Sequence, residues 1–142
     1  MRIYVAGALL GATDLEEACA RYWKLGNNLR ERGFDVYLPH EHTHPTGTRD
    51  LRARQVFDRG LRELQKSKVL LAMLDEPSLG TGAEIALALE EGMTVIGAHR
   101  FGNPVSRFVV GFLESATNAH MAVYEDLPRL AARVQEILEE RS

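Results

Sequence analysis

The chain has 142 residues, of which 45% are hydrophobic, with a net charge of −3 and a single cysteine. This length fits one domain, residues 1–142, with one core, and the composition is typical of soluble globular proteins. Lysine and arginine are spread along the chain, so no basic block indicates a nucleic-acid groove. The apolar N-terminus reaches Asp14 too early for a membrane span, and the lone Cys19 excludes an intramolecular disulfide. We therefore expect a cytoplasmic protein without nucleic-acid or membrane partners.

The first half of the chain alternates strand-like and helix-like segments. Residues 2–7 (RIYVAG) predict a buried strand that ends in glycine. A helix follows and stops at Gly33, and Thr13 and Glu16 have the spacing of a capping box at its start. A second strand over 34–39 leads into a polar loop, residues 40–50, long enough to suggest a function.

The second half repeats this alternation. A helix is predicted from about 50 to 66, and residues 68–75 (KVLLAMLD) are apolar on both faces, as in a central parallel strand. Further elements are a helix that contains Glu84 and ends at Gly92, a strand at 93–99, a loop and helix over 100–116, a strand at 119–124 and a closing amphipathic helix. The pattern predicts an α/β protein, a doubly wound (flavodoxin/Rossmann-like) five-stranded parallel sheet with helices on both faces.

Ligands of such sheets bind at the carboxyl ends of the strands, near the point where the strand order reverses. This rule selects four loops, which are residues 7–13, 40–50, 75–82 and 99–106.

Glu84 lies just after a glycine loop in the run PSLGTGAEIALALEEG, residues 77–92. Gly80 and Gly82 allow a ligand to approach the backbone closely, and N–H groups at a helix start can bind an anion. Thr81 and Glu84 have capping-box spacing, so Glu84 is either a helix cap or a first-turn carboxylate kept ionised by the helix dipole. An ionised, positioned carboxylate can attack a sugar carbon. The spacing does not decide between these two interpretations.

Two other groups of polar residues invite a functional interpretation. The run HEHTH, residues 40–44, suggests metal ligands, but successive residues of an extended loop point to opposite sides, and no second ligand cluster with familiar spacing appears. We expect this loop to line a pocket and predict no metal. Asp58, beside Arg54, Arg59 and Arg62 in a predicted helix, fits an ordinary surface charge.

Three stretches, residues 3–7 (IYVAG), 64–96 and 103–111 (NPVSRFVVG), together resemble the nucleoside 2-deoxyribosyltransferase superfamily. The similarity is densest over 64–111, and its specific part is the run P-S-L-G-x-G-x-E. The branch that this chain resembles most is that of the 2'-deoxynucleoside 5'-monophosphate N-glycosidases. The resemblance implies a doubly wound domain, dimeric or larger, that cleaves the N-glycosidic bond of a deoxynucleoside or its 5'-monophosphate.

The resemblance also implies roles for individual residues. The nucleophile falls on Glu84 and the tyrosine of the first strand on Tyr4. The serine that contacts the 5'-phosphate falls on Ser78, where the transferases carry aspartate. The serine that reaches a neighbouring subunit's phosphate falls on Ser106, and an asparagine donated across the dimer falls near Asn118. With Ser78, Ser106 and Asn118, the residues Gly7, His42, Gly80 and Gly82 complete the expected substrate-binding set.

The sequence departs from the family pattern at several positions. The helix aspartate of the family aligns with Gly60, and Asp58 lies two residues earlier, about 200° around a helix. A second aspartate aligns with Lys68, and the serine and arginine after the first strand align with Ala8 and Leu10. Side chains such as His40, His42 or Asp14 are candidates to compensate. A histidine of the loop at residues 40–44 has a pKa suited to protonating a leaving base, and a His42→Ala substitution would test this role.

These observations predict hydrolysis of a (deoxy)nucleoside 5'-monophosphate with Glu84, Tyr4 and Asp58 as catalytic residues and without a cofactor. The alternatives are a base-exchanging 2-deoxyribosyltransferase, a nucleotide-binding module with little turnover, and an unrelated domain in which Glu84 is only a cap. The apolar run at 107–113 (RFVVGFL) favours a homodimer or a higher homo-oligomer.

Overall fold

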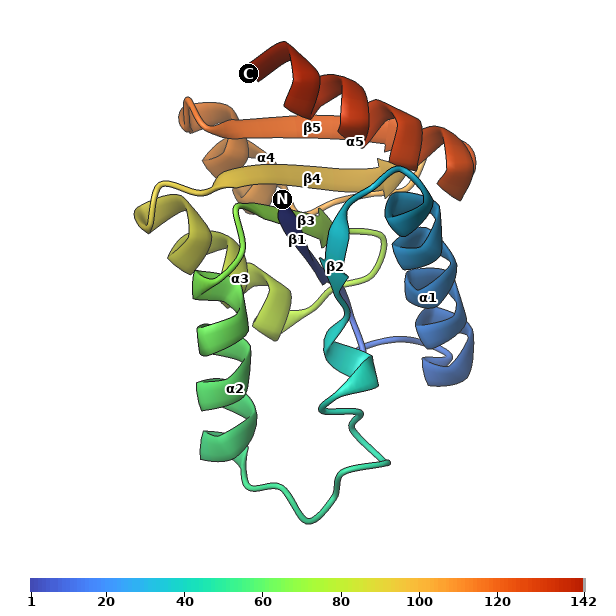
Figure 1. The fold of residues 1–142 in the computed structure, drawn as a ribbon, viewed down its shortest axis with the longest axis vertical. Helices are drawn as coiled ribbons and strands as arrows, with labels where there is room; N and C mark the ends of the chain where they lie inside the picture. Colours follow the sequence, from blue (N-terminus) through green and yellow to red (C-terminus); the bar gives the residue numbers. More distant parts are fainter. Residues whose placement is uncertain (142) are drawn as a thin grey trace.

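The computed structural model describes residues 1–141, and in it five parallel strands form one sheet in the order β2-β1-β3-β4-β5 (Figure 1). The strands are β1 (Arg2–Ala6), β2 (Asp35–Tyr37), β3 (Val69–Met73), β4 (Thr94–Arg100) and β5 (Ala119–Tyr124). The helices are α1 (Leu15–Glu31), α2 (Ala53–Gln65), α3 (Leu79–Glu90), α4 (Arg107–Ser115) and α5 (Leu127–Arg141), with a short 3-10 turn at Pro39–Glu41. This strand order is that of the flavodoxin-like doubly wound fold, so the predicted fold class is confirmed.

The helices form two layers that bury different side chains. One core joins the sheet to α1 and α5 and includes the fully buried Leu25 and Leu130. The other joins the opposite face to α2, α3 and α4 and includes Leu64, Ile85 and Leu113. Because β3 is covered on both faces, all five of its residues are buried, as its continuous apolar sequence predicts.

The helix ends explain where the loops begin. Gly33 and Gly92 follow α1 and α3 with φ of 92° and 76°, a left-handed conformation that glycine adopts without strain. The capping box predicted at Thr13 and Glu16 is wrong. Asp14 is the N-cap of α1, and its carboxylate accepts a hydrogen bond from the Glu17 N–H at 3.1 Å. The helix expected from residue 50 begins at Ala53, so the preceding loop is longer than predicted.

Candidate active site

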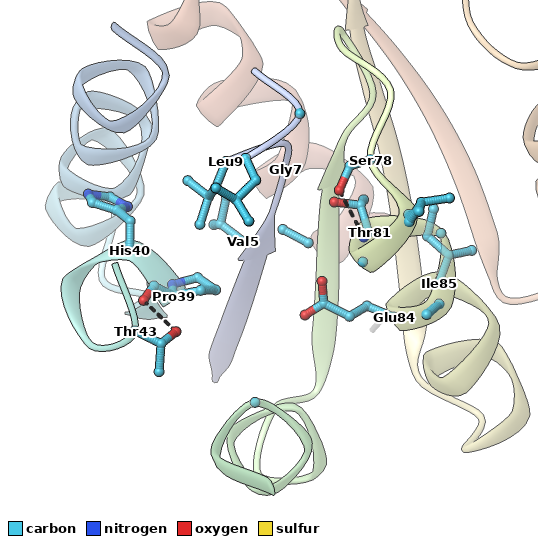
Figure 2. A pocket seen from close by; sticks show the side chains of 18 of the residues that line it. Val5, Gly7, Leu9, Pro39, His40, Thr43, Ser78, Thr81, Glu84 and Ile85 are labelled. Carbon is cyan, nitrogen blue, oxygen red and sulfur yellow. Dashed lines mark hydrogen bonds between the residues drawn. The ribbon is translucent and has the colours of Figure 1, made fainter. Parts of the chain in front are cut away.

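A cavity of about 1310 Å³ opens at the carboxyl edge of the sheet, between β1 and β3. This is the point where the strand order reverses. All four loops selected from the sequence contribute to its lining, through residues such as Leu9, Thr43, Ser78 and Val105. Figure 2 shows His40 and Thr43 on one side of the cavity, Ser78 and Glu84 on the other, and Gly7 between them. The volume exceeds the ~300–1,000 Å³ usual for small-molecule sites, so it has room for a nucleotide.

Glu84 points from α3 into this cavity (Figure 2). The helix begins at Leu79, and its N-cap is Ser78, whose Oγ accepts a hydrogen bond from the Thr81 N–H at 3.1 Å. Thr81 is therefore the third residue of the helix and Glu84 lies beyond the first turn. The capping-box interpretation of Glu84 is wrong, because the hydroxyl that would open the box belongs to a residue inside the helix.

The surroundings of Glu84 set its charge. Burial raises the pKa of its carboxyl, and a hydrogen bond with the Tyr4 hydroxyl acts in the opposite direction. Burial is the larger of these two effects, so it opposes the ionising influence expected from the helix dipole. The pKa of Tyr4 is raised, first by burial and then by the charge of Glu84, so its hydroxyl remains a donor.

The N-termini of α3 and α4 both meet the cavity, and each is capped by a serine. Ser106 Oγ accepts a hydrogen bond from the Val109 N–H at 3.4 Å, as Ser78 does for α3. A Cβ atom added to Gly82 would meet nothing within 4 Å, and one on Gly80 would meet only Ser78 Oγ at 4.0 Å. Internal packing therefore does not require glycine at these two positions, and the open space beside them is available to a ligand.

Gly7 also lines the cavity, but its glycine has a packing explanation. A Cβ at this position would lie 2.4 Å from Tyr22 Oη, and this hydroxyl donates a 2.8 Å hydrogen bond to the Ala8 carbonyl. The absence of a side chain at Gly7 lets Tyr22 pack against the backbone there and line the cavity.

In the loop at residues 40–44, the histidine that faces the cavity differs from the one predicted. His42 is not part of the cavity lining: its ring stacks on Tyr37 with centroids 4.8 Å apart, and its Nδ1 is 3.0 Å from Arg59 Nη2. His40 lines the cavity instead. Its buried Nδ1 has no hydrogen-bond partner within residues 1–141, and burial lowers the pKa of its imidazole. The prediction that His42 meets the substrate is therefore corrected, because His40 is the histidine that lines the cavity.

Asp58 lies outside the cavity lining, on the side of α2 where its carboxylate is 2.9 Å from Arg54 Nε. The prediction of Asp58 as a catalytic residue is therefore not supported by its position. Gly60 does line the cavity, and a Cβ there would lie 3.5 Å from Tyr4 Oη. The position that aligns with the family's helix aspartate thus faces Tyr4 but supplies no carboxylate.

Asn118 lies at the opposite, amino edge of the sheet, just before β5. Its Nδ2 donates a 2.6 Å hydrogen bond to the Met93 carbonyl, which ties the starts of β4 and β5 together. Within its own chain Asn118 is a structural residue, and its contribution to a neighbouring subunit stays a prediction.

Several cavity residues were not predicted from the sequence. Glu76 and Arg49 line the cavity, and the buried hydroxyl of Thr81 has no hydrogen-bond partner in the described part of the chain. The carboxylate of Glu76 accepts hydrogen bonds from the Thr13 N–H at 2.7 Å and from Arg21 at 3.1 Å. The available signal was the position of Glu76 in the loop that follows β3. Across residues 1–141, no three His, Cys, Asp or Glu side chains are grouped to hold a metal ion.

Fold and cavity together define a doubly wound α/β domain with a cavity, lined by the Glu84 carboxylate, at the switch point of its sheet. The chain belongs to the nucleoside 2-deoxyribosyltransferase family, whose model matches residues 3–126. The predicted family is thereby confirmed. No helix within residues 1–141 has both the length and the apolar character needed to cross a membrane.

Two relatives carry the same provisional name, 2'-deoxynucleoside 5'-phosphate N-hydrolase 1. The protein from Thermofilum pendens is 36% identical over 97 residues, which cover 68% of this chain and 66% of that protein. The protein from Methanococcoides burtonii is 25% identical over 113 residues, 78% of this chain and 90% of its own. These names and the family agree with the prediction of an enzyme of the N-glycosidase or deoxyribosyltransferase kind.

Two solved structures share the fold. A CMP N-glycosidase from Clostridium botulinum superposes with a TM-score of 0.71 at 18% identity, covering 96% of this chain and 99% of that one. A 2-deoxyribosyltransferase from Bacillus psychrosaccharolyticus gives a TM-score of 0.63 at 19% identity, with coverages of 92% and 90%. The likeness at these identities concerns the fold.

Proposed function

We propose that the chain hydrolyses the N-glycosidic bond of a (deoxy)nucleoside 5'-monophosphate with Glu84 as the nucleophile. The observation that carries the proposal is the placement of Glu84 beside Tyr4, in a cavity onto which the N-terminus of α3 also opens. A single ligand can then place its sugar at the carboxylate and its phosphate at the helix N-terminus.

The reaction proceeds in two displacements. A carboxylate oxygen of Glu84 forms a bond to C1' while the C1'–N bond breaks, and the bonding electron pair leaves with the base, which takes up a proton. Water then adds to C1', passes one proton to the solvent or a nearby base, and releases Glu84 as a carboxylate with the sugar phosphate. Only ionised Glu84 can begin the first step, so the Tyr4 hydrogen bond, which favours the charged form, assists it.

The phosphate preference rests on the N-terminus of α3. Ser78 Oγ takes up the Thr81 N–H, and Gly80 and Gly82 have no side chain that would cover the first turn of the helix from the cavity. Both relatives described above are named as 5'-phosphate hydrolases. Base exchange is the second candidate activity, and Ser78 in place of a transferase-type aspartate disfavours it. A binding module with little turnover is the third, favoured by the missing carboxylate at Gly60.

The proposal is tested by incubating the protein with nucleosides and their 5'-monophosphates and quantifying the released base. We expect release from at least one monophosphate and slower release from the matching nucleoside. Label exchange from an added free base into nucleoside would favour the transferase. Tight binding without product over a long incubation would favour the binding module.

The Tyr4→Phe variant should move the acid limb of the pH–rate profile to higher pH. The wild-type rate falls as Glu84 becomes protonated, and burial already places its pKa above the ordinary value. Removing a hydrogen bond that lowers this pKa extends the protonated range upward. The measurement is kcat between about pH 4 and pH 8. An unshifted limb with a uniformly lower rate would show that Tyr4 does not act on the ionisation of Glu84.

Replacing His40 with alanine should lower kcat for a purine monophosphate by at least about tenfold, because the imidazole N–H that can donate a hydrogen bond to the leaving base is lost. His42→Ala is the matched control in the same loop and should stay within about twofold of wild type, since His42 is outside the cavity. Equal losses in both variants would show that the loop acts through its conformation rather than through His40.

We also propose that the chain forms a homo-oligomer through α4. Phe108 on this helix is 85% exposed, and Ser106 lies at the start of the same helix beside the cavity. Burying this apolar side chain against a second copy would remove it from water.

A further inference from the structure

The carboxylate of Asp75, in the loop just after β3, binds three residues that lie in or after β4 and β5. It accepts a 2.7 Å hydrogen bond from the Arg100 N–H and a 3.1 Å bond from Asn103 Nδ2 at one oxygen. Its other oxygen accepts a bond from the Tyr124 hydroxyl. Burial raises the pKa of Tyr124, so this hydroxyl stays a donor, and the Arg100 guanidinium lies 5.5 Å above the same ring. Asp75 therefore holds together the carboxyl ends of β3, β4 and β5.

The segment that Asp75 holds leads directly to the cavity. A tight turn follows Arg100, closed by a 3.1 Å hydrogen bond from the Asn103 N–H to the Arg100 carbonyl, and Gly102 in it has a φ of 83°. The next three residues, Pro104, Val105 and Ser106, line the cavity and end in the serine cap of α4. The position of this rim therefore depends on the turn that the carboxylate fixes.

The neighbouring Glu76 makes the corresponding connection to the other side. Its carboxylate accepts hydrogen bonds from the Thr13 N–H, just before α1, and from Arg21 within α1. The contact between these loops is close, because a Cβ on Gly11 would lie 2.7 Å from the Pro77 carbonyl oxygen. Two consecutive carboxylates thus reach in opposite directions from the base of the loop that carries Ser78.

We propose that Asp75 is a positioning residue that sets the spacing between the N-termini of α3 and α4, and thereby the affinity for the 5'-phosphate. It does not line the cavity and acts only through the loops that it joins. This inference rests on the proposed function in assigning a phosphate to that end of the cavity.

The first test compares kinetics of Asp75→Ala with those of wild type. We expect KM for a 5'-monophosphate to rise about tenfold with kcat nearly unchanged, and KM for the matching nucleoside to stay constant, because the loss concerns phosphate placement. Asp75→Asn keeps the oxygen that accepts from Arg100 and Asn103, so it should restore most of the affinity. Equal losses for monophosphate and nucleoside would overturn the proposal.

The matched control is Asp126→Ala, which removes a carboxylate that accepts a 2.8 Å bond from the Arg129 N–H at the start of α5. Its loss should lower the melting temperature without changing either KM. A similar KM increase in this variant would assign the effect to general destabilisation and overturn the role of Asp75.

A second measurement separates this inference from the proposed activity. Inorganic phosphate should raise the melting temperature of wild type and of Asp126→Ala, but not that of Asp75→Ala. A wild-type shift without any turnover would refute the hydrolase and leave the positioning role standing. A full shift in Asp75→Ala, or none in wild type, would overturn the positioning role.

Discussion

Glu84→Gln should abolish base release, with a loss of at least about a thousandfold in kcat. The amide keeps the size of the side chain and an acceptor for Tyr4 but cannot form the ester with C1'. Because burial raises the pKa of Glu84, the neutral amide also removes a charge whose burial is unfavourable, so the variant should fold at least as well as wild type. The measurement is released base per enzyme over a long incubation.

Glu90→Gln is the matched control, because Glu90 lies on the same helix and is exposed to solvent. It should leave kcat within about twofold of wild type. Acid-quenched wild-type enzyme should also show a mass increase equal to the sugar phosphate during turnover, and Glu84→Gln should not. Substantial base release by Glu84→Gln would contradict the assignment of Glu84 as nucleophile.

The second large effect is expected for Ser78→Asp. The substitution retains helix α3, since aspartate and serine are comparable N-caps, but it places a negative charge where the substrate phosphate would bind. We expect kcat/KM for a 5'-monophosphate to fall by about a hundredfold or more, through like-charge repulsion and loss of space. The matching nucleoside should lose much less, so that the preference between the two substrates is reversed.

Ser78→Ala distinguishes repulsion from the loss of a hydroxyl. It removes the 3.1 Å bond to the Thr81 N–H and should cost about 1 kcal/mol of stability, yet it adds no charge. Its activity on the monophosphate should therefore fall less than that of Ser78→Asp, although it is the less stable protein. If both variants lose monophosphate activity equally, the phosphate does not bind beside Ser78.

The sequence pattern predicted the sheet and its loops well, because both depend on local periodicity. The N-cap residues of the helices were harder to predict. Thr13 with Glu16 and Thr81 with Glu84 match the capping-box spacing, but Asp14 and Ser78 match N-cap preferences equally well, and only the backbone conformation selects between them. The error at α3 matters most, because it left the role of Glu84 open.

The directions of the side chains in the loop after β2 could not be predicted from the sequence, and the reason differs from that for the helix caps. His40 and His42 are two residues apart and would share a side in an extended loop, but His40 lies in the 3-10 turn at Pro39–Glu41 and only His40 faces the cavity. The choice depends on the stacking of His42 on Tyr37 and its contact with Arg59, which come from β2 and α2. The direction of the Asp58 side chain was simpler to predict, because helical geometry alone places it away from the side of α2 that bears Gly60.

The order of the strands has a consequence for folding. Ile3 of β1 pairs with Val69 of β3, so Tyr4 and Glu84 meet only after the chain has closed a large loop containing α1, β2 and α2. Such non-local parallel pairing forms slowly, because its entropic cost precedes its stabilising contacts. The contact between Tyr4 and Glu84 therefore depends on the pairing of two strands far apart in the sequence, and the local structure of α3 alone cannot create it.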